Sequence, residues 1–339
     1  MAQHKTLAFF IPHRGCPHRC SFCDQRTISG TVQAPTPEEV TQTCQAMLER
    51  SGSLESAEIA FFGGSFTAVE PAYQIALLEA AQPFLGEGMF SGIRISTRPD
   101  AVDSAVLERL ERYHVTAVEL GAQSMCDRVL YQNERGHDVQ AVRQASAMLR
   151  ERGFSLGLQQ MVGLYGSTLQ DEYDTLEQLL ACQPETLRIY PTAVLDGTKL
   201  AEYYFRGGYP QLSQEEVLDY CADALCRCHH AGVRVIRLGL HAGMEMQRGC
   251  VAGPWHPAFR ELCEGRLYRM AAQPLLERLP KGEPVTFLVH PAAVSKAVGH
   301  KRENLLWWEQ QGCRVRVRGR DGVPLWQIET EEQTKDVNR

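Results

Sequence analysis

The sequence predicts an α/β fold: a partial (β/α)6 TIM-like barrel followed by a small C-terminal α+β module. Short apolar stretches alternate with stretches of about ten to fifteen residues that have helical periodicity, as in βαβ units with a parallel sheet. Six apolar stretches precede residue 191, two fewer than a closed barrel needs. Glycine-rich and polar motifs follow the predicted strands, where barrels gather their functional groups. We therefore favour the open barrel over a doubly wound sheet.

Local signals define the individual elements. Residues 7–11 form a short apolar and aromatic run that Pro12 ends, which predicts a buried strand. Thr36 before Pro37 predicts a capped helix that ends near Arg50. The same reasoning predicts further strands at 58–62, 92–97, 115–120, 154–161, 187–190 and 233–240, and further helices at 71–85, 101–113, 138–152 and 169–182.

The chain of 339 residues is long enough for one large domain and an appendage. We expect the barrel to span residues 1–245 and a helical linker to span 246–281. A small basic α+β module is expected at 282–328, with a strand at 285–289, a helix at 291–311 and a strand at 313–318. The polar residues 329–339 are expected to be a disordered tail.

Composition narrows the class of protein. Hydrophobic residues make up 44% and charged residues 22%, as in ordinary globular proteins. The net charge of −6 excludes a wholly basic nucleic-acid-binding protein, so any such binding must be local. No apolar run reaches about 18 residues and no signal peptide is evident, which predicts a cytoplasmic protein without membrane contact. The 12 cysteines are scattered apart from one group, which fits a reducing compartment.

That group consists of Cys16, Cys20 and Cys23, spaced C-x3-C-x2-C in the loop after the first strand. Three thiols this close together predict a metal centre. A structural zinc ion needs four protein ligands, and the nearest candidates for the fourth are His13 and His18. A [4Fe–4S] cluster usually takes four thiolates, so three cysteines would leave one iron open to another ligand. A chance grouping is the third alternative.

The spacing of these cysteines resembles the signature loop of the radical S-adenosylmethionine (SAM) superfamily. The resemblance implies that Cys16, Cys20 and Cys23 hold a [4Fe–4S] cluster whose open iron binds SAM. It further implies that an external one-electron donor such as flavodoxin or ferredoxin drives the cleavage of SAM to a 5′-deoxyadenosyl radical. Phe22 stands where that superfamily has an aromatic residue beside the cofactor; a hydrophobic shield around the cluster is an equally good interpretation.

Glycines follow the second predicted strand at Gly63 and Gly64 and leave the backbone free to approach a ligand. With Ser65 they resemble the superfamily's "GGE" motif, which binds the amino group of the methionine moiety, although Ser65 replaces the acid. This resemblance implies a backbone role for all three residues. The alternative is a tight turn between strand and helix.

Two further motifs follow the fourth and fifth predicted strands. Glu119 and Gln123 belong to a segment that, by the family resemblance, contacts the ribose; a carboxylate there can accept hydrogen bonds from hydroxyls. The alternative for Glu119 is a solvated strand end. Gly163 lies in a segment that resembles the superfamily's adenine-binding region, with Tyr165 where many relatives have proline.

Residues 187–200 and 203–209 narrow the resemblance to the catalytic subunit of Elongator and its prokaryotic relatives, over about residues 5–245. The chain is too short for that subunit's acetyltransferase domain, so acetyl transfer is not expected. The kinship implies an RNA substrate, such as a tRNA base. Two alternatives stay open: a small-molecule substrate such as a tetrapyrrole, and a non-catalytic metal-binding or RNA-binding protein. The sequence identifies no catalytic residue beyond the cofactor ligands.

The C-terminal module is the expected RNA contact. Residues 281–321 contain eight basic and four acidic residues. Arg314, Arg316 and Arg318 alternate with apolar residues, so they share one face of the predicted strand and can meet phosphates. The alternative is a charged edge strand that resists pairing with other chains.

Overall fold

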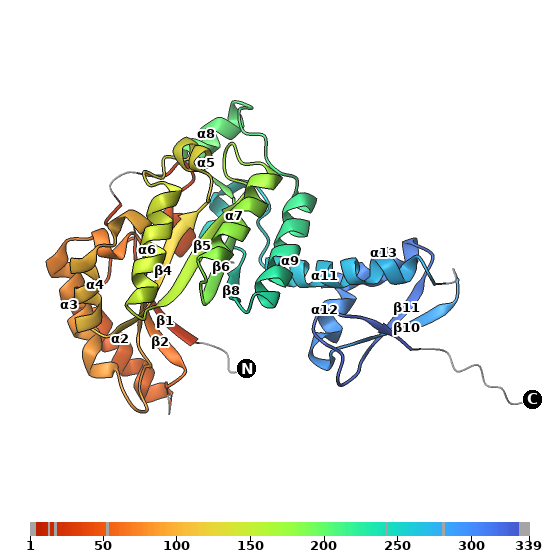
Figure 1. The fold of residues 1–339 in the computed structure, drawn as a ribbon, viewed down its shortest axis with the longest axis horizontal. Coiled ribbons are helices and arrows are strands. Elements are labelled where there is room, and N and C mark those ends of the chain that lie inside the picture. The colour runs from red at the N-terminus through yellow and green to blue at the C-terminus, as the bar shows by residue number, and fades with distance from the viewer. Residues whose placement is uncertain are drawn as a thin grey trace, which may run out of the picture. The chain divides into compact units, whose positions relative to one another are not determined.

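The computed structural model describes residues 5–12, 14–16, 19–51, 54–241, 243–279 and 282–331. The chain forms two compact units (Figure 1). The larger unit comprises Met1–Ser213 and Cys228–Pro257, and the smaller unit comprises Gln214–Arg227 and Ala258–Arg339. Among the described residues, no helix combines the length and the apolar composition needed to cross a bilayer.

A parallel sheet of seven strands forms the centre of the larger unit, in the order β1-β2-β3-β4-β5-β6-β8. The strands are β1 Lys5–Ile11, β2 Ala57–Gly63, β3 Ile93–Thr97, β4 Val115–Gln123, β5 Ser155–Val162, β6 Thr186–Pro191 and β8 Arg234–Leu238. All six pairings are parallel, which confirms the open α/β barrel. The strand expected at 233–240 is β8, so the sheet has seven strands where the partial barrel was expected to have six.

The helices that connect these strands are α2 Pro37–Arg50, α3 Pro71–Ala81, α4 Ser104–Arg112, α6 Val139–Glu151 and α7 Leu169–Ala181. They lie along the outside of the sheet (Figure 1). Thr36 and Glu39 form the capping box that starts α2, as its sequence predicts. The helix expected at 71–85 ends at Ala81 and continues only as the 3-10 turn Gln82–Phe84, because Pro83 cannot continue an α-helix.

Several short elements of the larger unit had no detectable sequence signal. They are α1 Gln25–Ser29, α5 Asp127–Gln132, α8 Lys199–Phe205, α10 Met244–Gly249 and the strands β7 Val194–Leu195 and β9 Cys250–Ala252. The helices have five to seven residues, too few for periodicity to appear. β7 and β9 pair antiparallel in a sheet of their own.

The smaller unit packs helices on a three-stranded sheet of order β11-β10-β12. Its elements are the first part of α9 Gln214–His230, α11 Phe259–Leu276, β10 Pro284–Val289, α12 Val294–Val298, α13 Glu303–Gln310, β11 Arg314–Gly319 and β12 Glu329–Thr330. Phe287 and Trp308 are fully buried in its core with ring centroids 5.2 Å apart. The segment expected to be a linker contains α11, and its Leu276 is buried in this same core.

Two expectations for the C-terminal part are wrong. The helix expected at 291–311 is broken into α12 and α13, because Gly299, Lys301 and Arg302 have φ angles of 83°, 49° and 66°. The tail expected to be disordered from Glu329 starts with β12, where Glu329 pairs with Leu288 of β10. Residues 332–339 of that tail lie outside the described residues.

Candidate functional site

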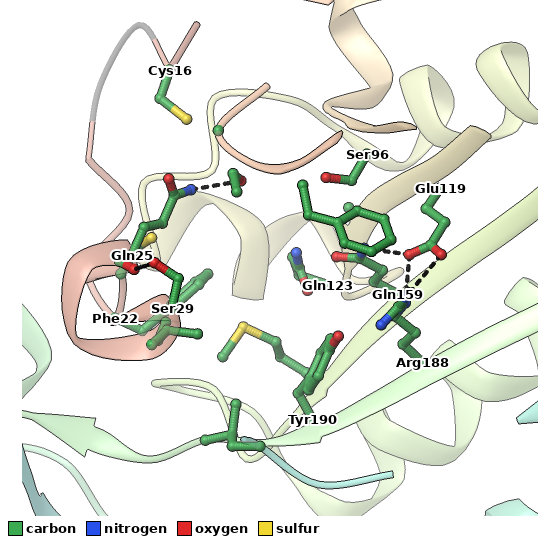
Figure 2. A pocket seen from close by; sticks show the side chains of 18 of the residues that line it. Cys16, Phe22, Gln25, Ser29, Ser96, Glu119, Gln123, Gln159, Arg188 and Tyr190 are labelled. Carbon is green, nitrogen blue, oxygen red and sulfur yellow. Dashed lines mark hydrogen bonds and ion pairs between the residues drawn. The ribbon is translucent and has the colours of Figure 1, made fainter. Parts of the chain in front are cut away.

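A cavity of about 210 Å³ lies at the carboxyl ends of the barrel strands and extends into the barrel interior. Residues from β1 to β6 line it, together with α1 and the loop that carries the cysteines. Figure 2 shows Cys16 and Gln25 on one side of the cavity, Arg188 and Glu119 on the other, and Gln123 between them. The site expected from the strand-end motifs is therefore a single hollow.

The three cysteines are brought to one region of this cavity. Cys16 and Cys23 line it, and Cys20 packs with Cys23 against the hydrophobic cluster around Phe22. Burial raises the pKa of the Cys23 thiol to about 12, and the Cys20 and Cys16 sulfurs add to the rise. Burial and the Cys20 sulfur likewise raise the pKa of Cys16. These thiols therefore lose their protons most readily in the presence of a partner with positive charge, such as a metal centre.

Two arginines face these sulfurs. The Arg135 guanidinium donates from Nη1 to Cys20 Sγ at 3.1 Å and from Nη2 to the Gly121 carbonyl at 2.6 Å. Arg98 holds a bidentate ion pair with Asp100 at 2.9 and 2.8 Å. Both guanidinium groups lower the pKa of Cys16, although burial outweighs them. The cysteine side of the cavity is therefore electropositive.

The cysteine loop and the glycine motif are locked together through their backbones. The Ser65 N–H donates to the Arg14 carbonyl at 2.9 Å, and the Gly64 N–H donates to the Ile11 carbonyl at 2.8 Å. A Cβ on Gly64 would collide with the Arg14 carbonyl, and one on Gly15 would collide with the Ser65 carbonyl. Glycine is required at both crossings, so the motif fixes the position of the cysteine loop.

Of this motif, Gly63 and Gly64 line the cavity, whereas Ser65 does not. The Gly63 carbonyl accepts from Gln25 Nε2 at 2.8 Å. The Ser65 hydroxyl is buried, lies 2.8 Å from Thr97 Oγ1 and accepts from the Arg98 N–H at 3.1 Å. Ser65 therefore joins the ends of β2 and β3, and its hydroxyl is directed away from the cavity.

Glu119 and Gln123 both line the cavity from β4. β4 extends to Gln123, so Glu119 lies within the strand with only 1% of its surface exposed, and its interpretation as a solvated strand end is wrong. Both its oxygens are bound by Arg188, at 2.5 and 2.8 Å, and Gln159 donates to it at 3.1 Å. Gln123 has a left-handed φ of 68°, which is strained for a residue with a side chain.

The adenine-binding segment expected around Gly163 meets the cavity only at Met161. The Gly163 N–H donates to Glu172 at 2.7 Å, behind the cavity wall. Tyr165 packs against Tyr203, with ring centroids 4.8 Å apart. Phe22 is buried and forms part of the wall beside the cysteines.

Sequence reasoning missed several residues that line the cavity. Arg98 directly follows β3, so the strand-end rule would have found it had it been applied to that strand. Arg135 follows α5, at no strand end, and nothing local to its sequence marks it. Gln25 belongs to the short helix α1, which periodicity did not reveal. Arg188 and Tyr190 were not missed: they belong to the motif at residues 187–200, and they line the wall opposite the cysteines from β6.

The open parallel barrel with three thiols at the carboxyl ends of its strands defines the class of radical SAM folds. Comparison with protein families supports this class: residues 10–179 match the radical SAM superfamily, and residues 184–269 match its C-terminal domain, described as Radical_SAM C-terminal domain. The chain belongs to the radical SAM superfamily. It is accordingly an enzyme of a superfamily that uses a [4Fe–4S] cluster and SAM and needs an electron donor.

Several curated relatives are named tRNA uridine(34) acetyltransferase or Elongator complex protein 3. The chain is 27% identical to the tRNA uridine(34) acetyltransferase of Dehalococcoides mccartyi over 57% of this chain and 50% of the relative. It is 30% identical to an uncharacterized protein of Methanocaldococcus jannaschii over 62% of this chain and 68% of the relative. The chain thus spans about half the length of the acetyltransferase relatives it matches.

Among solved structures, the archaeal Elp3 of Methanocaldococcus infernus with an N-terminal deletion superposes with a TM-score of 0.62 at 18% identity. The match covers 80% of this chain and 64% of that chain. This likeness supports the fold and confirms the open barrel expected from the sequence.

The residues present fit the two cofactors of the superfamily. Among the described residues, no group of three acidic, histidine or cysteine side chains is arranged to hold a single metal ion. A [4Fe–4S] cluster needs a different arrangement, because its thiolate ligands bind separate irons and do not converge on one ion. In the cavity, Gln123 Oε1 and Arg135 Nε are buried without a hydrogen-bond partner among the described residues, which suits a polar ligand. His13 and His18, the alternative zinc ligands, lie outside the described residues.

Proposed function

We propose that Cys16, Cys20 and Cys23 hold a [4Fe–4S] cluster, that SAM binds in the adjoining cavity, and that the chain modifies an RNA base by radical chemistry. The observation that carries this proposal is that Cys16 and Cys23 line the cavity together with the glycine motif, while Cys20 packs beside Cys23 against the cluster around Phe22. Held by Cys16, Cys20 and Cys23, the reduced cluster would supply the electron for cleaving SAM, and hydrogen-atom abstraction from the substrate would follow.

The chain's own residues would contribute binding and orientation. Gly63 and Gly64 let the backbone come close to the methionine moiety, while Gln123 offers an unpaired amide oxygen to SAM. Arg135 would balance the negative charge of the cysteine sulfurs and of a carboxylate in the cavity. Phe22 would exclude water from the cluster. Both oxygens of Glu119 are already bound by Arg188, so Glu119 would reach a ribose only by sharing that acceptor.

An RNA substrate, such as a tRNA base, is supported by the names of three relatives, which are tRNA uridine(34) acetyltransferases. The cavity lies at the carboxyl ends of the strands and extends into the barrel, so a target base would have to leave its stack to reach it. The reductant would be a small redox protein such as flavodoxin or ferredoxin.

The smaller unit offers a surface for the RNA backbone. Arg314, Arg316 and Arg318 are all exposed and alternate with the half-buried Val315 and Val317 on β11. Arg318 lies 4.0 Å from Glu331, whereas Arg314 and Arg316 have no acidic partner among the described residues. The two unpaired guanidinium groups stand about 7 Å apart along the strand. We propose that they bind phosphates.

Anaerobic reconstitution with iron and sulfide tests the cofactor assignment. Wild-type chain should take up about four irons per chain and, with dithionite and SAM, release 5′-deoxyadenosine. Cys20→Ala should lose both properties. Cys226→Ala is the matched control, because Cys226 lies on α9, away from the cysteine loop, and should leave both unchanged. Zinc or no metal in the wild-type chain would contradict the proposal.

The RNA assignment needs a separate test. Total tRNA should bind the full-length chain under anaerobic conditions. The double variant Arg314→Ala with Arg316→Ala should bind more weakly, and the slope of its binding constant against salt concentration, on logarithmic scales, should fall by the amount expected for about two lost phosphate contacts. Arg278→Ala, just beyond the end of α11, is the control for the loss of one exposed positive charge. Nucleoside analysis of RNA from a deletion strain should then reveal a missing modification. Unchanged binding and an unchanged nucleoside profile would favour a small molecule, such as a tetrapyrrole.

A further inference from the structure

Two arginines face each other inside the barrel. β6 and β8 pair in a register that places Arg188 directly opposite Arg237. Neighbouring strands are about 4.8 Å apart and paired residues point to the same face, so both side chains point to the interior face of the sheet. Arg188 lines the cavity there, and Arg237 is its neighbour behind the lining residues. Like charges opposite each other on adjacent strands destabilise a sheet. Such a pair calls for an explanation.

The neighbouring carboxylates neutralise the charge of Arg188 but not that of Arg237. Glu58, Arg94, Glu119 and Arg188 form a buried chain of alternating charges, with Glu58 to Arg94 at 2.6 Å, Arg94 to Glu119 at 3.5 Å and Glu119 to Arg188 at 2.5 Å. Its two acids and two arginines cancel. Arg237 has no carboxylate within ion-pair distance among the described residues.

The surroundings of Arg237 leave its donors available. Its Nε donates to the Gly239 carbonyl at 2.9 Å, and no other hydrogen bond of this side chain occurs among the described residues. Burial lowers the pKa of Arg237, the Tyr190 phenol opposes that change, and the Arg188 charge adds to it. An anion beside both guanidinium groups would relieve the repulsion between them.

We infer that Arg188 and Arg237 together bind an anionic group of the substrate, a phosphate or a carboxylate. Arg188 is already held in place, because its guanidinium lies 4.7 Å from the centre of the Phe62 ring and pairs with Glu119. A guanidinium fork matches the oxygens of phosphates and carboxylates. An RNA backbone phosphate and a carboxylate of a small molecule share this chemistry.

This inference rests on the proposed function only in that a substrate enters this cavity. Arg188 and Tyr190 lie across the cavity from Cys16 (Figure 2), so the anion would bind apart from the cysteines. The assignment therefore concerns the substrate and not the cofactors.

Binding to the cluster-free full-length chain tests it by titration calorimetry. The probes form two pairs: uridine 5′-monophosphate against uridine, and succinate against succinamide. The wild-type chain should bind the charged member of at least one pair about tenfold or more tightly, as one charge-assisted hydrogen bond provides. Arg237→Gln should remove that preference and Arg237→Lys should keep most of it. Arg234→Gln, an exposed arginine on the same strand, is the matched control and should keep all of it.

The outcomes separate the sources of the anion. A preference for the nucleotide alone assigns a phosphate, a preference for succinate alone assigns a carboxylate, and either supports the pair. No preference in the wild-type chain, or one that survives Arg237→Gln, overturns the inference. Because Arg237→Gln removes a repulsion, its thermal unfolding midpoint should not fall. These measurements involve no turnover, so they stand even if the chain fails to cleave SAM.

Discussion

The buried carboxylate of Glu119 offers the sharpest test of how the barrel interior is held together. Glu119→Gln keeps the shape of the side chain and removes its charge. Arg94 would keep its ion pair with Glu58, at 2.6 Å. Arg188 would lose the only carboxylate that it contacts among the described residues, whose two oxygens lie 2.5 and 2.8 Å from its guanidinium nitrogens. The exposed fractions of the Glu119 and Arg188 side chains are 1% and 15%, so water can compensate little.

Removing one member of a buried ion pair costs about 3–5 kcal/mol. The glutamine oxygen can still accept one hydrogen bond from Arg188, so we expect the low end, a loss of about 3 kcal/mol in the free energy of unfolding. The assay is urea unfolding of the cluster-free chain, followed by far-UV circular dichroism. Glu111→Gln is the control: its ion pair with Arg152 spans 3.1 Å with both side chains 39% exposed, and such pairs contribute about 0–1 kcal/mol.

A double substitution checks the cause. If the cost of Glu119→Gln comes from the stranded Arg188 charge, then adding Arg188→Gln should restore at least about 1 kcal/mol relative to the sum of the single losses. If Glu119→Gln and Glu111→Gln lowered the free energy of unfolding by the same amount, the reasoning would be refuted. Strict additivity of the double variant would refute it as well.

Three further predictions follow from local geometry. Gly64→Ala should displace the cysteine loop, because its Cβ would collide with the Arg14 carbonyl, and should lower the iron content after reconstitution; Gly243→Ala, which has open space around its Cβ, should not. Burial raises the pKa of Glu172 to about 7. As pH rises from about 4.5 to 7, the free energy of unfolding of the wild-type chain should therefore fall by about 3 kcal/mol relative to that of Glu172→Gln, and above pH 7 the difference between the two should stay constant. A difference in unfolding free energy that does not change between pH 5 and 8 would contradict this. Asn304→Ala should destabilise the smaller unit by about 2–3 kcal/mol in thermal unfolding, because the buried Nδ2 donates to two carbonyls at 2.8 and 3.0 Å; a midpoint like that of the wild type would contradict this.

The sequence predicted those elements whose signals are local. The capping box at Thr36 and the alternation of strands and helices were sufficient to predict the barrel, and the strand-end rule was sufficient to predict where its cavity lies. The break between α12 and α13 was not predictable in the same way, because lysine and arginine favour helices and yet Lys301 and Arg302 adopt left-handed backbone conformations. There the packing of the smaller unit overrides local preference.

The candidate site shows the same division. Cys16, Cys23, Gly63 and Gly64 lie in contiguous motifs, and the structure places all four on the cavity. Glu119 lies on the cavity as expected, but it is buried within β4 and is not at a solvated strand end. Its burial depends on the extension of β4 to Gln123, beyond the expected end at residue 120. Ser65 and Gly163 belong to the expected motifs but lie behind the cavity wall, because their polar groups are bound by neighbouring elements.

The arginine pair shows why the substrate side of a barrel escapes sequence reasoning. Arg188 and Arg237 lie 49 residues apart in the sequence, and their contact depends on the register of β6 against β8. The pairing shifts by one residue between Leu187 and Arg188, since Leu187 pairs with Val235 whereas Arg188 pairs with Arg237. Without that shift Arg188 would face Ile236, and Arg237 would point away from the interior. One irregularity in the sheet therefore creates the excess positive charge, and because such irregularities occur next to active sites, it supports a role in binding.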